Sequence, residues 1–284
     1  MKLKHVDIAK LNDGDSVKGF FLCKSFNINF TRLGEEYIDC ILENKSGSIR
    51  AKVWHFIDEF KHRIIKDMPI AVKGDIITFN NALEVKISSI NIVNSDIYNS
   101  YGYDANFLIK SISDNKETLF KKLQFYIDSL ESNYKKITKN IIKDNYEKVI
   151  SYPSIDRSYD LNGGLLKQIV SVLDLNKKIS SKYIDLDNHL VQAGIILKNI
   201  GCIHYFNDDL QYSISNNNKR VGFKLLGINI VNDYSMLYTK FSQTIKTQLQ
   251  NIILSEKSEN DVNVNYINSI YGFDLSIKQF DKKQ

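Results

Sequence analysis

The chain has 284 residues, of which 43% are hydrophobic and 25% charged, and its formal net charge is +5. This composition is typical of a soluble globular protein with one large or two ordinary domains. No run of eighteen apolar residues is present, so a membrane-spanning helix is not expected. The mild positive charge permits contact with nucleic acid but does not require it.

Three cysteines, Cys23, Cys40 and Cys202, are widely separated and form no CxxC pair. An odd number without paired spacing predicts buried thiols in a reducing compartment. The first fifteen residues carry charge but no apolar core of a secretory signal. We therefore expect a cytoplasmic protein without membrane association.

The N-terminal part of the sequence alternates between apolar and polar residues with a period of two, which predicts β-strands. Five runs show this pattern: 16–30, 35–44, 48–54, 69–80 and 82–93. A short helical stretch, 55–65, lies between the third and fourth runs, and Phe56, Phe60 and Ile64 would share one face of it. Five strands with one helix after the third is the order of an OB-fold barrel.

The third predicted strand places side chains alternately inside and outside the barrel. Ile49, Ala51 and Val53 would point inward, and Arg50, Lys52 and Trp54 outward into solvent. OB-folds bind single-stranded nucleic acid on strands two and three with aromatic and basic side chains. The candidate binding residues are Arg50, Lys52, Trp54, Tyr37, Phe26, Phe30 and Arg32. The alternative is that Phe26, Phe30 and Tyr37 close the ends of the barrel.

A polar, tyrosine-rich linker over 96–108 is predicted to separate the barrel domain, 1–95, from a helical domain, 109–284. Apolar residues three and four apart predict helices over 105–112, 116–132 and 133–150. One apolar stripe is Leu119, Leu123, Tyr126, Ile127 and Leu130. Tyr152-Pro153 would end the third helix, and the region 158–281 continues as helix with breaks at Gly163-Gly164, Gly201 and 258–261.

Two phrases in the helical domain carry a family resemblance. "SYPSIDRSYDLNGGLLKQIVSVLDL", 151–175, and "LVQAGIILKNIGCI", 190–203, resemble the phrases "HHxFxGGLLxHT" and "AGILLHDIGK" of the YhaM family of bacterial 3′→5′ exoribonucleases. The phrases "LNDGDSVKGFFLCKS", "KSGSIRAKVW" and "LLGINIV" are also similar to the family, and the resemblance covers about residues 10–280. It implies an α+β two-domain protein in which an N-terminal five-stranded OB-fold barrel precedes an all-α HD-type phosphohydrolase domain.

The resemblance also implies where the family's metal ligands would lie. HD-type hydrolysis needs imidazoles and carboxylates that hold divalent cations and activate water. Those positions fall on Ser158, Tyr159, Gln168, Lys198, Asn199, Ile228, Asn251 and Asp274. Only Asp274 keeps a ligand type, and an ammonium group at Lys198 would repel a cation. We therefore expect a degenerate HD site, with no metal, no cofactor and no catalytic residue.

Other candidate sites carry less information. His5, His55, His62, His189 and His204 show no metal-binding spacing, and a helix N-cap at Asp187 or Asn188 explains the polar loop beside His189. The lysines over 116–148 either follow a phosphate backbone or form a solvated helix face, and the interspersed acids favour the solvated face.

These patterns predict a non-catalytic protein that binds single-stranded RNA or DNA, derived from a YhaM-type exoribonuclease. One alternative is an active 3′→5′ exoribonuclease with an atypical ligand set that uses Mn or another divalent metal. A second is a protein–protein adaptor that uses the barrel and the vacated HD pocket. The resemblance suggests self-association, so a homo-oligomer or a protein partner remains open.

Overall fold

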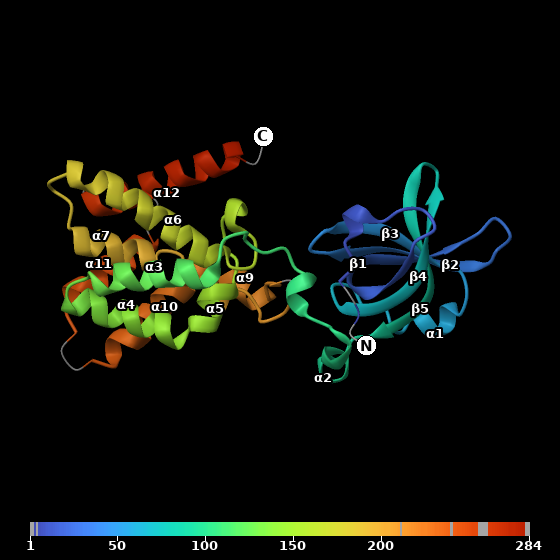
Figure 1. Cartoon of the computed structure of the whole chain (residues 1–284). Helices are drawn as coiled ribbons and strands as arrows, with labels where there is room; N and C mark the ends of the chain where they lie inside the picture. The colour runs from blue at the N-terminus through green and yellow to red at the C-terminus, as the bar shows by residue number, and fades with distance from the viewer. Residues whose placement is uncertain (1–2, 4, 211, 239–240, 255–260, 282–284) are drawn as a thin grey trace. The chain divides into compact units, whose positions relative to one another are not determined.

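The computed structural model describes residues 3, 5–210, 212–238, 241–254 and 261–281. The chain divides into two compact units, Met1–Lys110 and Ser111–Gln284. Each unit has its own cluster of buried hydrophobic side chains. The first unit is built on β-strands and the second on helices (Figure 1).

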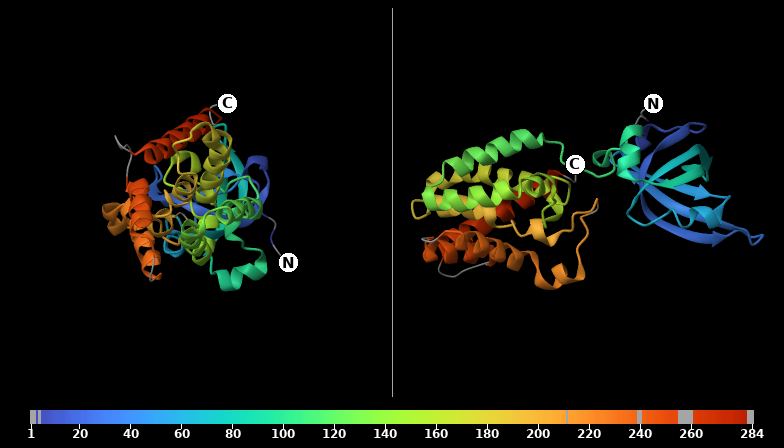
Figure 2. Two further views of the ribbon diagram at one scale, coloured as in Figure 1. Left: turned by 90° about the vertical axis from the view of Figure 1, so that its left-hand side faces the viewer. Right: turned by 90° about the horizontal axis from the view of Figure 1, so that it is seen from below.

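The first unit is a closed five-stranded barrel with the strand order β1-β2-β3-β5-β4. The strands are β1 (Ser16–Phe30), β2 (Glu36–Asn44), β3 (Gly47–Val53), β4 (Pro69–Phe79) and β5 (Ala82–Ile92). β3 and β5 pair in parallel, and the other neighbours pair antiparallel. With helix α1 (Ile57–Phe60) between β3 and β4, this is the OB-fold, and the predicted fold is confirmed (Figure 2).

The helix between β3 and β4 is shorter than the predicted stretch 55–65. Phe60 and Ile64 are buried against the barrel, as their spacing suggested. Phe56, however, is exposed and has a φ of 60°, in the left-handed region. The prediction that Phe56 shares their face is wrong because the helix begins only after this residue.

The segment after β5 packs on the barrel unit itself. It contains α2 (Ser95–Tyr98) and two 3-10 turns, Asn99–Tyr101 and Ala105–Phe107. The N–H of Lys45 donates to the carbonyl of Phe107 at 2.9 Å, and the rings of Tyr98 and Tyr103 meet Phe20 edge-on. The helix predicted over 105–112 is wrong beyond the short turn, because Leu108 and Ile109 are buried as irregular chain.

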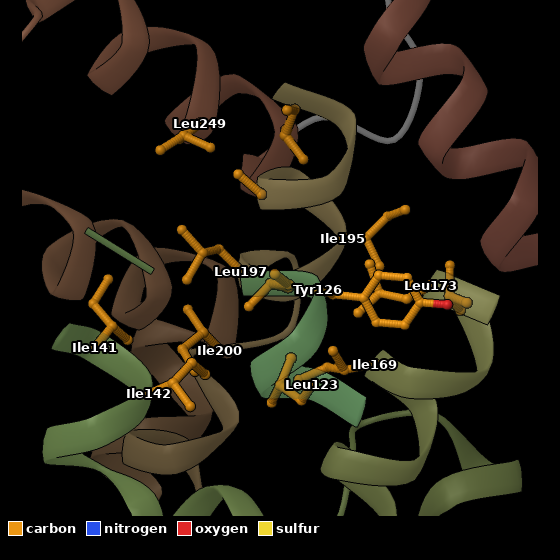
Figure 3. Close-up of a cluster of buried hydrophobic side chains, with 14 of the residues drawn as sticks. Leu123, Tyr126, Ile141, Ile142, Ile169, Leu173, Ile195, Leu197, Ile200 and Leu249 are labelled. Atoms are coloured by element: carbon orange, nitrogen blue, oxygen red, sulfur yellow. The ribbon is translucent and has the colours of Figure 1, made fainter. Parts of the chain in front are cut away.

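The second unit is helical. Its helices are α3 (Lys116–Asp128), α4 (Ser132–Asp144), α5 (Tyr146–Ser151), α6 (Gly164–Ile179), α7 (Asn188–Leu197), α8 (Cys202–Tyr205), α9 (Asn216–Val221), α10 (Phe223–Met236), α11 (Gln243–Leu254) and α12 (Val262–Asp281). The predicted stripe from Leu119 to Leu130 is buried in its core. Figure 3 shows Leu123 of α3 beside Ile169 of α6 in this core.

The boundaries of these helices have local causes. The predicted helix 133–150 is divided at Asn145, whose side chain donates to the carbonyl of Ile141 at 2.9 Å. Asp187 caps α7 by accepting from the N–H groups of His189 and Leu190, as predicted. Gly163 precedes α6 with a φ of 85°, which favours glycine. The predicted break at 258–261 lies outside the described residues except for its last position.

None of the described helices combines the length and the apolar character needed to cross a bilayer.

Candidate nucleic-acid interface and buried polar network

Two predicted binding residues form a ring stack on the outer face of the barrel. Tyr37 lies on β2, and Trp54 directly follows β3. Their ring centroids are 4.7 Å apart and the planes differ by 20°. Both side chains are half-buried, so part of each ring remains accessible. Strand alternation places them on this face, and the antiparallel pairing of β2 with β3 brings them together.

Lys52 lies on the same outer face, but it does not extend into solvent. Only 8% of the residue is exposed, so the prediction of a solvent-facing lysine is wrong. Its Nζ lies 2.9 Å from Oε2 of Glu84 on β5 and 4.4 Å from the ring centroid of Phe79 at the end of β4. The long side chain is covered because the neighbouring strands supply both an acid and an aromatic ring.

Arg50 is also paired with an acid. Its Nε donates to Oδ1 of Asp39 at 2.9 Å, and its Nη2 contacts the other carboxylate oxygen. The hydrogen bonds from Arg50 hold the pKa of Asp39 below its ordinary value, and the same pair raises the pKa of the guanidinium. Since Nε is also 3.9 Å from Oε1 of Glu84, two cations face two carboxylates, and the charges of this face balance.

The remaining predicted residues lie on the β1–β2 hairpin. Phe30 is 64% exposed and Arg32 is exposed, both near the hairpin tip. Phe26 is partly buried and packs against the barrel core. A hollow of about 320 Å³ lies beside Arg50 and is lined by Ser25, Asn27, Asp39, Ile41 and Ser48.

The eight residues that the YhaM resemblance aligns with metal ligands are called the HD-like positions. In the helical unit, two of them meet in a buried amide network. Gln168 and Asn199 are both buried. The Nε2 of Gln168 donates to Oδ2 of Asp156 at 2.6 Å, and its Oε1 accepts from Asn199 Nδ2 at 2.8 Å. Ser154 donates its hydroxyl to the same Gln168 oxygen. Both polar ends of the Gln168 amide are therefore satisfied inside the protein.

Two further HD-like positions form a second buried pair. The Tyr159 hydroxyl donates to Oδ2 of Asp274 at 2.6 Å, and the Ser171 hydroxyl donates to Oδ1 at 2.5 Å. Tyr159 and Asp274 are 1% and 6% exposed. Burial and the Asp274 carboxylate raise the pKa of Tyr159, so the phenol keeps its proton and remains a donor.

The other HD-like positions do not join these networks. Lys198 donates to Oδ1 of Asn268 at 2.6 Å and lies 5.7 Å from the ring centroid of Tyr271. Ile228 is packed in the hydrophobic core, Asn251 is exposed and Ser158 is half-buried. The resemblance therefore aligns eight positions, of which the structure gathers four into buried hydrogen bonds.

The donor set at these positions does not fit an HD-type metal centre. Within the described ranges, no three His, Cys, Asp or Glu side chains are close enough to hold a metal ion. The carboxylates present, Asp156 and Asp274, already accept hydrogen bonds from neutral amide and hydroxyl groups. Such groups are poor replacements for the imidazoles and carboxylates that bind divalent cations.

All five histidines of the sequence are exposed or half-buried. His55 and His62 are exposed beside the barrel helix. His189 lies in the first turn of α7, with Nε2 3.2 Å from Oε1 of Glu131. The ring of His5 stacks on Phe107 at 3.4 Å.

No family model matches the chain. Among solved structures, the chain is similar to the second OB-fold domain of replication protein A from Methanococcus maripaludis, with 20% identity, a TM-score of 0.27, and coverage of 33% of this chain and 96% of that one. It is also similar to a mitochondrial single-stranded DNA-binding protein from S. cerevisiae, with 13% identity, a TM-score of 0.26, and coverage of 29% and 97%. A third match is a replication protein A heterotrimer bound to ssDNA, with 18% identity, a TM-score of 0.25, and coverage of 31% and 63%. The OB-fold assignment itself rests on the strand order and pairing described above.

Proposed function

We propose that the chain binds single-stranded RNA or DNA along the outer face of β2 and β3 and does not hydrolyse it. The Tyr37–Trp54 stack on the outside of an OB barrel is the observation that carries this proposal. OB-folds use this face for single strands. Each base stacked on an aromatic side chain contributes about 1–3 kcal/mol.

The charge balance of this face determines the kind of binding we expect. Arg50 and Lys52 are paired with Asp39 and Glu84, so they neutralise few phosphates. Stacking on Trp54 and hydrogen bonding then supply most of the affinity at this face. Binding there should depend only weakly on salt, because few counterions are released.

The helical unit is proposed to be a degenerate HD domain. The proposed arrangement is a barrel domain, 1–95, a linker, 96–108, and an HD-like domain, 109–284. Together these parts make the chain, in this proposal, a non-catalytic relative of YhaM-type exoribonucleases. The hydrogen-bonded state of Asp274 supports this proposal. Its carboxylate already serves Tyr159 and Ser171, which leaves it poorly placed to hold a cation. Shortening of a labelled RNA by the purified protein with Mn²⁺, lost on addition of chelator, would contradict it.

Replacing the stacked rings should weaken binding. Trp54→Ala or Tyr37→Ala is expected to raise the Kd for a fluorescein-labelled oligo(U) or oligo(dT) by about 5- to 150-fold, the equivalent of one lost stack. Fluorescence anisotropy measures this change. Phe273→Ala, which removes an exposed ring from α12, is the matched control. Equal weakening by all three variants would show that the barrel face is not the binding site.

Removing an acid from this face should strengthen binding. Asp39→Asn frees Arg50 from its carboxylate partner and leaves a net positive charge on the face. We expect a several-fold lower Kd and a salt slope steeper by about 0.7, corresponding to one additional phosphate contact. Asp58→Asn makes the same charge change on exposed α1 and is the control. An unchanged slope for Asp39→Asn would place the phosphates elsewhere.

A protein-binding adaptor is the second candidate function, and the hairpin tip favours it. Ile28, Phe30 and Leu33 are all exposed there. Exposed apolar side chains that lie together often mark protein interfaces. A stoichiometric partner, or a second copy of the chain, that remains bound after nuclease treatment and in high salt would support this function. Release of that partner by Phe30→Ser and Leu33→Ser would assign it to the hairpin.

A further inference from the structure

The groove between α3 and α6 combines positive charge with an exposed aromatic ring. It is a hollow of about 760 Å³ on the helical unit. Its lining includes four lysines, one aspartate and one phenylalanine: Lys121, Lys122, Lys177, Lys178, Asp174 and Phe125. We call this the α3–α6 groove.

The single carboxylate of the groove is already occupied. Asp174 accepts from the Tyr126 hydroxyl at 2.8 Å, and its Oδ2 lies 3.1 Å from Nζ of Lys122. Among the described residues, Lys121, Lys177 and Lys178 have no carboxylate within 4.0 Å, and all three are exposed. The groove therefore carries an excess of positive charge, unlike the balanced outer face of the barrel.

Phe125 lies among these lysines and is 63% exposed. Nζ of Lys177 is 5.5 Å from its ring centroid, and the Tyr126 ring packs against it edge-on at 5.9 Å. The exposed part of the ring is therefore available for contact with a ligand. An exposed aromatic ring among cations is the combination that binds single-stranded nucleic acid, because bases stack on the ring while phosphates pair with the cations.

Other polyanions fit the groove less well. A membrane-bound helix face needs apolar side chains along several turns, whereas Phe125 is the one exposed large hydrophobic side chain among the residues that line the groove. An acidic peptide would use the lysines but would gain nothing specific from a flat ring. The chemistry of a nucleotide, a planar base joined to a phosphate, matches both parts.

We propose that the α3–α6 groove is a second binding site for single-stranded nucleic acid, in which Phe125 stacks a base and Lys121, Lys177 and Lys178 contact phosphates. This inference rests on the proposed function for its class of ligand but uses a different unit of the chain. It assigns most of the salt dependence of binding to the helical unit, because the cations of the barrel face are already paired.

The test compares two double variants of the full chain by anisotropy with labelled oligo(dT). Lys121→Gln/Lys178→Gln removes two cations from the groove, and Lys139→Gln/Lys143→Gln removes two exposed lysines from α4 as the control. Each phosphate contact on a single strand contributes about 0.7 to the salt slope, so the slope of the groove variant should be smaller than that of wild type by about 1.4. Raising the salt fourfold should then weaken wild-type binding about sevenfold more than binding by the groove variant.

A third variant tests the aromatic part of the groove. Phe125→Ala should raise the Kd about 5- to 150-fold, and Phe273→Ala should leave it unchanged. The second measurement is a competition with poly-glutamate that carries the same total charge as the oligonucleotide. If the same concentration of poly-glutamate displaces the oligonucleotide from wild type and from Phe125→Ala, the groove is a general polyanion site and the inference is overturned.

The outcomes separate this inference from the barrel proposal. Groove variants that behave as their controls overturn the α3–α6 site, while a defect in Trp54→Ala leaves the barrel site supported. Groove variants that fail while Trp54→Ala binds normally support the groove and overturn the barrel face. A wild-type chain that binds neither oligo(U) nor oligo(dT) overturns both.

Discussion

Gly201→Ala is expected to destabilise the helical unit by about 3 kcal/mol, because it inserts a methyl group where two backbones touch. A Cβ at this position would lie 1.8 Å from the carbonyl oxygen of Phe223 and 2.7 Å from the amide nitrogen of Gly227. Neither atom belongs to a flexible side chain, so α10 must move away from the start of α8. That movement would open the core around Ile203 and Ile228.

Chemical denaturation followed by circular dichroism measures this loss. Gly272→Ala is the control, since a Cβ there meets nothing within 4 Å and the residue is exposed on α12. In a helix this substitution should stabilise the protein by about 0.5–1 kcal/mol. If Gly201→Ala unfolds at the same denaturant concentration as wild type, the close approach of α8 and α10 is incorrect.

Tyr159→Phe is expected to lower the free energy of unfolding by about 1.5–3 kcal/mol at pH 7. The substitution keeps the ring but removes the hydroxyl that donates to Asp274, which leaves a buried carboxylate with one donor fewer. Loss of a hydrogen bond to a charged group costs more than loss of a neutral one, because the charge stays buried.

Urea denaturation measures this effect, and Tyr183→Phe serves as the control because that ring is exposed. A double-mutant cycle with Asp274→Asn isolates the interaction of the pair from other effects of each change. If Tyr159→Phe has the same free energy of unfolding as wild type, the hydrogen bond from the phenol does not stabilise the buried Asp274 carboxylate.

The barrel could be predicted from sequence because its signals are local. Alternating runs, separated by Asn80-Asn81 and similar turns, gave strand bounds close to those observed. The helix after β3 was overestimated because the spacing of Phe56 and Phe60 is also compatible with a single turn. The division of α4 from α5 at Asn145 depends on one side chain bonding to the backbone, which periodicity does not reveal.

The outer face of the barrel was predictable only in part. Alternation along β2 and β3 places Tyr37 and Trp54 together, and the same alternation places Asp39 beside them. Glu84 could not be found in this way, because its contact with Lys52 needs the parallel pairing of β3 with β5. The position of Lys52 on this face could therefore be predicted from the sequence. Its pairing with Glu84 could not, because β5 is distant from β3 along the chain.

The HD-like positions show a similar limit. The aligned phrases identified Tyr159 and Asp274 separately, but only the folded chain shows that they hydrogen-bond across 115 residues. Lys198 and Asn199 are adjacent in sequence, yet Lys198 contacts Asn268 and Asn199 contacts Gln168. Both residues lie in the turn that follows α7, where their side chains point in different directions, so adjacency in sequence does not define a shared site.

The most direct test of nucleic-acid binding by the barrel uses the fluorescence of Trp54, the one tryptophan in the sequence. Titration of the full chain with unlabelled oligo(U) or oligo(dT) should change its emission in a saturable manner, because bases stack against the Tyr37–Trp54 pair. The midpoint should match the Kd measured by anisotropy. Binding detected by anisotropy with no change in Trp54 emission would contradict the proposed site.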